Sequence, residues 1–168
     1  MKIYAIEGLD GSGKSTLIKS PLIELLGVDR KKLLILKEDF SWYEKGLEPE
    51  EHIRNIAEIR KPLLGHWIKI GMDQEKDIII DRWWGSTYAY QGTTSRLQDL
   101  ILPFLLETKV EYIFLNTPIN TCIERVAARG EIPDSFEKNV EIFQRYIDIS
   151  PLFRLVVGKW ITVLSRDN

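Results

Sequence analysis

The chain has 168 residues, of which 44% are hydrophobic, and its formal net charge is -2 at pH 7. This length and apolar content suffice for one domain with a buried core, so we expect a single domain over residues 1–168. The near-neutral charge gives no overall attraction to nucleic acid or anionic membranes, and we expect neither as a partner. No apolar run is long enough to span a bilayer, and the single cysteine, Cys122, excludes an internal disulfide. The chain opens on a strand pattern instead of a targeting leader, so we expect a cytoplasmic protein.

Five short apolar runs are typical of strands buried on both faces of a parallel sheet. These runs are Lys2–Glu7, Leu33–Leu36, Asp77–Asp81, Tyr112–Leu115 and Trp160–Leu164. Helical spacing predicts helices over Ser15–Leu26, from Pro49 past Leu64, over Ser86–Tyr90 and over Ser95–Leu106. A fifth helix is predicted from Pro118 to about Ala128. After the polar gap Arg129–Ser135, a sixth is predicted to about Ser150. Pro21 and Pro62 predict a break or a kink in the first two helices. This alternation predicts an α/β fold of three layers, with a parallel five-stranded sheet between helices.

The first predicted strand leads into Gly8–Thr16, where a glycine, four further residues and then Gly-Lys-Ser follow one another. This is the spacing of the P-loop, whose glycines allow backbone N–H groups to turn toward nucleotide phosphates. The helix that follows adds its positive N-terminal end. We expect Lys14 to contact the β- and γ-phosphates and Ser15 to bind Mg²⁺. The segment therefore predicts a P-loop fold that binds a nucleoside triphosphate.

Two further polar segments follow predicted strands, at Lys37–Phe40 and at Asp81-Arg82. Ligands of parallel sheets bind beyond the carboxyl ends of the strands, so we expect both segments to share one cleft with the P-loop. Asp81 stands where P-loop proteins keep a carboxylate near Mg²⁺. Arg82 offers a guanidinium suited to bidentate phosphate binding. The cleft is thus predicted to handle phosphate groups.

Several segments of the chain are similar to the thymidylate kinase family. Glu7–Thr16 reads E-G-L-D-G-S-G-K-S-T, Asp81-Arg82 is followed by Trp83, and Ser86–Gly92 reads S-T-Y-A-Y-Q-G. The family characteristically has E-G-x-D-G-x-G-K-S-T, D-R-Y and S-x-x-A-Y-Q-G. Arg125–Glu131 with Phe136-Glu137 resembles the family's lid, which we expect at about residues 129–136. The resemblance implies a kinase that transfers the γ-phosphate of ATP to a deoxynucleoside monophosphate, foremost dTMP, giving dTDP for DNA precursor synthesis.

The same resemblance implies a role for individual residues. It assigns catalysis to Lys14, Arg82 and Arg129, with Arg129 closing over the phosphates, and it assigns Mg²⁺ to Ser15 and Asp81. The implied ATP contacts are Gly8, Asp10, Gly11, Ser12, Gly13, Lys14, Ser15, Thr16 and Arg125. The implied acceptor contacts are Asp10, Lys37, Phe40, Arg60, Arg82, Ser86, Tyr90 and Gln91. Members of the family form homodimers, so the resemblance also implies a homodimer.

The chain departs from the family pattern in three places that bear on the acceptor and the lid. Lys37–Ser41 replaces the family's R-E-P-G-G segment, and Ile56 stands where a phenylalanine usually stacks on the thymine. In the lid, Ser135 occupies the second basic position and Pro133 is inserted, which leaves Arg129 as the main lid charge. The first two departures leave the identity of the base open, and none removes the predicted phosphate-binding residues.

Two other functions stay open on the sequence. A deoxynucleoside kinase acts on a free 5′-hydroxyl and needs a carboxylate base after the second strand, where Glu38 or Asp39 would serve. Such enzymes generally have Glu-Arg-Ser after the third strand, whereas this chain has Asp81-Arg82-Trp83. A nucleotide-binding protein without catalysis is the second alternative. A GTPase is disfavoured because the chain has no Asn-Lys-x-Asp segment.

Overall fold

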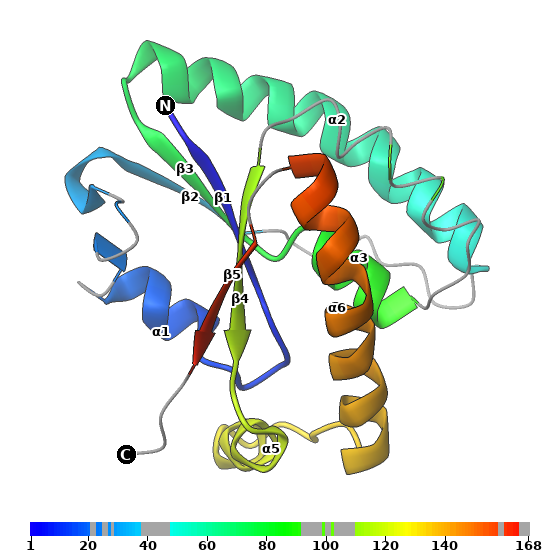
Figure 1. Ribbon diagram of the computed structural model, residues 1–168. Coiled ribbons are helices and arrows are strands. Elements are labelled where there is room, and N and C mark those ends of the chain that lie inside the picture. The colour runs from blue at the N-terminus through cyan, green and yellow to red at the C-terminus, as the bar shows by residue number, and fades with distance from the viewer. Residues whose placement is uncertain are drawn as a thin grey trace.

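The computed structural model describes residues 1–20, 23–24, 27, 29–37, 48–91, 99, 102, 110–157 and 160–164. Its strands are β1 (Ile3–Glu7), β2 (Leu33–Lys37), β3 (Asp77–Asp81), β4 (Val110–Asn116) and β5 (Trp160–Leu164). They form one parallel sheet in the order β2-β3-β1-β4-β5 (Figure 1). All five predicted strands are therefore confirmed, and with them the α/β fold class.

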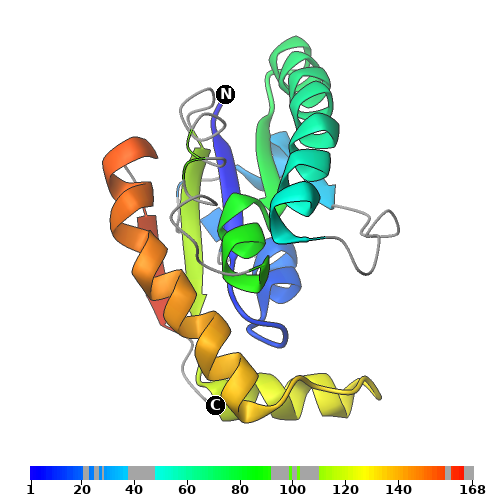
Figure 2. The same cartoon turned by 90° about the vertical axis from the view of Figure 1, so that its right-hand side faces the viewer.

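Helices cover both faces of the sheet. They are α1 (Lys14–Lys19), α2 (Pro49–Asp73), α3 (Trp84–Gln91), α5 (Ile119–Ala128) and α6 (Phe136–Val157), with a 3₁₀ turn, η2, at Arg30–Lys32. The helices α2, α3 and α6 lie on one face and α1 lies on the other (Figures 1 and 2). Helix α5 lies beyond the carboxyl end of β4 (Figure 1). This arrangement confirms the predicted three layers.

Alternation along the central strand divides the core between the two faces. Ile3 and Ala5 of β1 belong to a cluster with apolar residues of α2, α3 and α6. Tyr4 and Ile6 belong to a second cluster, which includes Ile18 of α1. All four β1 side chains are buried, as a strand covered on both faces requires. The sheet therefore holds the residues that follow β1 and β3 in fixed positions at its carboxyl edge.

One helix ends just before a proline, whereas two others continue through one. Helix α1 ends at Lys19, and Ser20 is extended, as the residue before a proline prefers. The break predicted at Pro21 is therefore confirmed, and α1 itself stops short of the predicted end near Leu26. Helix α2 runs uninterrupted through Pro62. Helix α6 likewise continues through Pro151 to Val157, beyond the predicted end near Ser150.

Two further expectations concern helix boundaries and membranes. Pro118 is the N-cap of α5 instead of lying within its first turn.

Of the helix predicted over Ser95–Leu106, only residues 99 and 102 are described, and both are helical. In the described part of the chain, no helix has the length and apolarity needed to cross a bilayer.

Candidate active site

The P-loop leaves the carboxyl end of β1 and leads directly into α1. Gly11 has φ +79° and Gly13, the N-cap of α1, has φ +95°, both in the region that favours glycine. A Cβ on Gly11 would lie 2.2 Å from the carbonyl oxygen of Cys122 in α5. Gly11 is therefore required by close packing against α5 as well as by the backbone turn.

Two residues at the end of β4 and in α5 fix the loop from outside. Thr117 is buried, and its Oγ1 donates a hydrogen bond of 2.8 Å to the carbonyl oxygen of Ser12. Arg125 Nη1 donates to the carbonyl oxygen of Gly11 at 3.4 Å, so the predicted ATP contact does lie beside the P-loop. The sequence analysis missed Thr117. Thr117 directly follows β4, the strand that pairs with β1, and this position at the carboxyl edge of the sheet would have pointed to it.

Lys14 lies inside the curve of the loop. Its Nζ donates to the carbonyl oxygens of Gly8, at 3.1 Å, and Leu9, at 2.8 Å, and the residue is 7% exposed. Burial, and after it the charge of Arg82, lowers the pKa of Lys14 to about 7. The amine is thus held at the predicted phosphate site before any nucleotide arrives.

The two predicted metal ligands lie together. Ser15 Oγ is 3.4 Å from Oδ2 of Asp81, although the residues are 66 positions apart. Asp81 is buried, and among the described residues its Oδ1 has no hydrogen-bond partner. A hydroxyl beside a carboxylate with an uncommitted oxygen matches the oxygen ligands that Mg²⁺ prefers. These residues therefore fit a magnesium ion.

Arg82 follows β3 in a left-handed conformation, with φ +72°. Its guanidinium contacts the Asp10 carboxylate and donates to Gly8 O and Ser86 Oγ, each at 3.4 Å. It also lies 5.1 Å from the ring centre of Tyr90. Burial lowers the pKa of Arg82, but Tyr90, Tyr146 and Asp10 together raise it above its ordinary value. The side chain therefore stays charged beside the P-loop.

Three of the predicted acceptor residues, Asp10, Ser86 and Tyr90, contact the guanidinium of Arg82. Ser86, Tyr90 and Gln91 belong to α3, and the Tyr90 hydroxyl accepts a 3.2 Å hydrogen bond from the Asp10 backbone N–H. Lys37 is exposed at the end of β2, in register with Asp81. Phe40, and the alternative bases Glu38 and Asp39, lie outside the described residues. The structure thus brings the P-loop and Asp81-Arg82 together, as the strand rule predicts, and α3 also contacts both.

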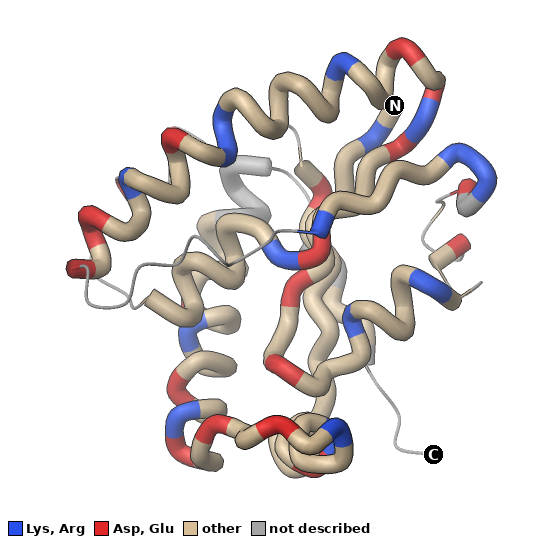
Figure 3. Tube along the Cα trace, turned by 180° about the vertical axis from the view of Figure 1, so that it is seen from behind, with Lys and Arg blue, Asp and Glu red and all other residues tan. Residues whose placement is uncertain are grey.

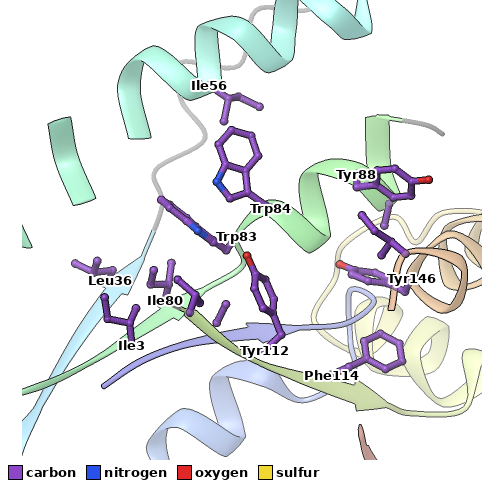
Figure 4. Close-up of a cluster of buried hydrophobic side chains, with 14 of the residues drawn as sticks. Ile3, Leu36, Ile56, Ile80, Trp83, Trp84, Tyr88, Tyr112, Phe114 and Tyr146 are labelled. Atoms are coloured by element: carbon purple, nitrogen blue, oxygen red, sulfur yellow. The ribbon is translucent and has the colours of Figure 1, made fainter. Parts of the chain in front are cut away.

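Arg60, which the family resemblance assigns to the thymine base, is enclosed by aromatic rings. Its Cζ lies 4.6 Å from the ring centres of both Trp83 and Trp84. Its Nη1 donates a 2.8 Å hydrogen bond to Thr87 Oγ1, and the residue is 2% exposed. Ile56 is also buried and lies against the indole of Trp84 (Figure 4). The structure therefore places Arg60 within the packed core of α2 and α3.

Residues 129–135 connect α5 to α6 at the predicted lid. Charged residues of both signs follow one another here (Figure 3). Arg129 forms an ion pair with Glu131, with Nε 3.2 Å from Oε1, and both side chains are at least half exposed. A cavity of about 240 Å³ separates the segment from Asp10 and is lined also by Ile123, Val126 and Asn139. The predicted lid therefore faces the P-loop residue Asp10 across this cavity.

Comparison with known proteins places this site in a family. The sequence profile of thymidylate kinase matches residues 46–166. The chain is 27% identical over 151 residues to the thymidylate kinase of Brachyspira hyodysenteriae, covering 81% of this chain and 73% of that protein. It is 28% identical over 153 residues to that of Xanthomonas campestris, covering 80% of this chain and 64% of that protein.

A solved structure supports the fold. The crystal structure of thymidylate kinase from Ehrlichia chaffeensis matches with a TM-score of 0.67, over 99% of this chain and 88% of that one. The two sequences are 18% identical, so this likeness concerns the fold alone. The family profile covers well over half of the chain, including α2, β3, α3 and the lid segment. The chain therefore belongs to the thymidylate kinase family.

Proposed function

We propose that this protein transfers the γ-phosphate of ATP to dTMP, giving ADP and dTDP. The observation that carries the proposal is the position of Arg82. Its guanidinium is held by Gly8 and Ser86 at the edge of the same P-loop that encloses Lys14. Both side chains donate to the carbonyl oxygen of Gly8, so two basic groups on separate segments lie side by side, as a donor and an acceptor phosphate require.

In the proposed mechanism, positioning and charge neutralisation carry the reaction, and no covalent intermediate is needed. Lys14 stabilises negative charge on the transferring phosphoryl group, and Arg82 binds the 5′-phosphate of the acceptor. Asp10 accepts a hydrogen bond from the 3′-hydroxyl of the sugar, while α3 lines the acceptor site with Ser86, Tyr90 and Gln91. Arg125 lies toward the adenine side.

Ser15 and Asp81 would hold Mg²⁺, with Asp81 acting through a water molecule. These two residues would hold the ion where its charge would offset the negative charge of the nucleotide phosphates. Support comes from the 3.4 Å approach of the two side chains and the uncommitted Oδ1 of Asp81. Arg129 would leave Glu131 and close over the phosphates, which excludes water from the transfer.

We also propose that the protein is a cytoplasmic homodimer. Exposed apolar side chains recur along two helices of the same face of the sheet, Ile59 and Leu63 on α2 and Phe136, Val140 and Ile147 on α6. A second copy would shield such residues from water. Light scattering should give twice the 19.6 kDa chain mass.

An acceptor panel tests the proposed activity. The protein is supplied with ATP and Mg²⁺ together with each of the four common deoxynucleoside monophosphates, or with thymidine, and the products are separated by chromatography. We expect dTDP to form in step with ADP, and the reaction to stop when the metal is chelated. ADP formation from thymidine but not from dTMP would instead favour a nucleoside kinase. ATP binding without turnover of any acceptor would favour a non-catalytic nucleotide-binding protein.

A further inference from the structure

A buried carboxylate lies behind the proposed acceptor site. Glu7, the last residue of β1, is fully buried. Its Oε1 accepts a 3.0 Å hydrogen bond from the backbone N–H of Trp83, and its Oε2 accepts one from the Ser86 hydroxyl. Burial raises the pKa of Glu7, whereas the contacts with Ser86, Arg82 and Trp83 oppose that rise. Glu7 therefore belongs to a hydrogen-bonded group that includes Arg82.

The hydrogen bonds around Ser86 have a definite direction. A serine hydroxyl has one hydrogen, and a carboxylate only accepts, so Ser86 donates to Glu7. The Ser86 oxygen then has its lone pairs free for Arg82 Nη1, at 3.4 Å, and the Tyr146 hydroxyl, at 2.8 Å. A charged Glu7 thus makes Ser86 an acceptor toward the guanidinium.

Glu7 also controls the backbone around Arg82. The Arg82 N–H donates to Ile6 O at 3.1 Å, and the next N–H, that of Trp83, donates to Glu7. These two bonds hold a residue whose φ of +72° is costly for a side chain other than glycine. At Gly85, an added Cβ would lie only 2.8 Å from Glu7 Oε1, so the carboxylate packs directly on the start of α3. The turn that presents Arg82 is built around Glu7.

We propose that Glu7 is a positioning residue for the phosphate-binding arginine. Through the Trp83 N–H and Ser86 it holds the guanidinium of Arg82 where an acceptor phosphate binds. It does not touch the substrate, because it is fully buried behind α3. The inference rests on the proposed function for the identity of the acceptor, but the geometry of the group does not depend on it.

The first test is a comparison of Michaelis constants. In Glu7→Gln the amide keeps one acceptor for the Trp83 N–H but donates toward Ser86, which reverses the hydrogen bonds of that hydroxyl. We expect the KM for dTMP to rise about tenfold and the KM for ATP to stay within twofold. Tyr4→Phe is the matched control, since Tyr4 is a fully buried residue of the same strand on the opposite face of the sheet. It should change neither constant.

Gly85→Ala gives a second route if Glu7→Gln folds poorly. The added methyl displaces the Glu7 carboxylate but removes none of the polar groups of the cluster. It should raise the KM for dTMP selectively, as Glu7→Gln does. A rise of both KM values together, or no rise in either variant, would overturn the inference.

Epistasis tests whether Glu7 acts through Arg82. In an Arg82→Ala background, Glu7→Gln should add less than a twofold change in the KM for dTMP, because the group it positions is gone. A full tenfold effect in that background would contradict a positioning role.

A measurement without substrate separates this inference from the proposed function. The NMR signal of the Arg82 side chain, assigned by its loss in Arg82→Lys, should shift or broaden in free Glu7→Gln and stay unchanged in Tyr4→Phe. If the wild-type protein failed to phosphorylate dTMP, the proposed function would be wrong. The Arg82 signal would then be the one test of whether Glu7 positions Arg82. A signal that is the same in Glu7→Gln and wild type would refute the positioning role.

Discussion

The carboxylate of Asp10 contacts the guanidinium of Arg82, and so joins the P-loop to the end of β3 across 72 positions of sequence. The two partners differ in exposure, because the side chain of Asp10 is 60% exposed and that of Arg82 only 13%. Asp10 is therefore the partner that is free to turn toward an incoming sugar, while Arg82 stays in place. This difference in exposure suits the roles that we propose for the two residues.

The proposed contact of Asp10 with the sugar predicts a change in specificity. Asp10→Asn should lower kcat/KM for dTMP by about tenfold, since a hydrogen bond to a charged acceptor is worth about 1.5–3 kcal/mol. The same substitution should have little effect with 2′,3′-dideoxythymidine monophosphate, which lacks the 3′-hydroxyl. Kinetics of both enzymes with both acceptors measure this coupling. Equal losses with the two acceptors would show that Asp10 does not contact the 3′-hydroxyl.

The buried position of Lys14 predicts a large loss of turnover in Lys14→Ala. Lys14 is preorganised toward the phosphates, and removing one such contact in an active site costs about 3–4 kcal/mol. We expect kcat to fall by at least a hundredfold while circular dichroism and thermal unfolding still show a folded protein. A folded variant that keeps half of the wild-type rate would rule out the role given to Lys14.

Features that depend on local pattern and residue type were predicted well. Asp81 ends an apolar run, and Ser15 follows a glycine-lysine pair. The rule that ligands gather at the carboxyl ends of parallel strands brought both residues together. The five strands could also be predicted from the sequence, because a strand covered on both faces is apolar throughout its length.

Features that depend on tertiary packing were not predicted. The contacts of Thr117 with the P-loop and of Tyr146 with Ser86 join residues that are 105 and 60 positions apart, and neither has a local signature. The enclosure of Arg60 by two indoles depends on how α2 packs against α3, which periodicity alone does not specify. The continuation of helix α6 through Pro151 was not predicted either, because tertiary context overrides local helix propensity.

The burial of Ile56 changes what a larger side chain should do at that position. Had the site been an open gap beside the base, Ile56→Phe would tighten dTMP binding. The structure places Ile56 in the core, 3% exposed and against Trp84. We therefore expect Ile56→Phe to lower the free energy of unfolding by about 1–3 kcal/mol, as overpacking does, without lowering the KM for dTMP. Urea unfolding and steady-state kinetics check the two parts, and a lower KM at unchanged stability would contradict this packing.

The lid segment should respond to substrates. Lys138 and Asn139 hold the far end of the segment at Asp134 and Ser135. Ile132 is 97% exposed, and Arg129 is paired with Glu131 instead of the P-loop, so the part expected to move is residues 129–133. A bisubstrate analogue that joins ATP to dTMP should bring Arg129 to the phosphates and slow proteolysis of this segment at least tenfold. Arg129→Ala should remove most of that protection. Cleavage at the same rate with and without the analogue would argue against closure.

The central claim is that the acceptor is recognised by its phosphate through Arg82, and one comparison tests it most directly. kcat/KM is measured for dTMP and for thymidine with the wild-type protein and with Arg82→Ala, at saturating ATP and Mg²⁺. A charge-assisted bidentate contact of about 2–4 kcal/mol predicts that the wild type prefers dTMP strongly. Arg82→Ala should then lose roughly thirty- to a thousandfold with dTMP and little with thymidine. Equal use of thymidine and dTMP by the wild type, or an Arg82→Ala variant with an unchanged KM for dTMP, would contradict the claim.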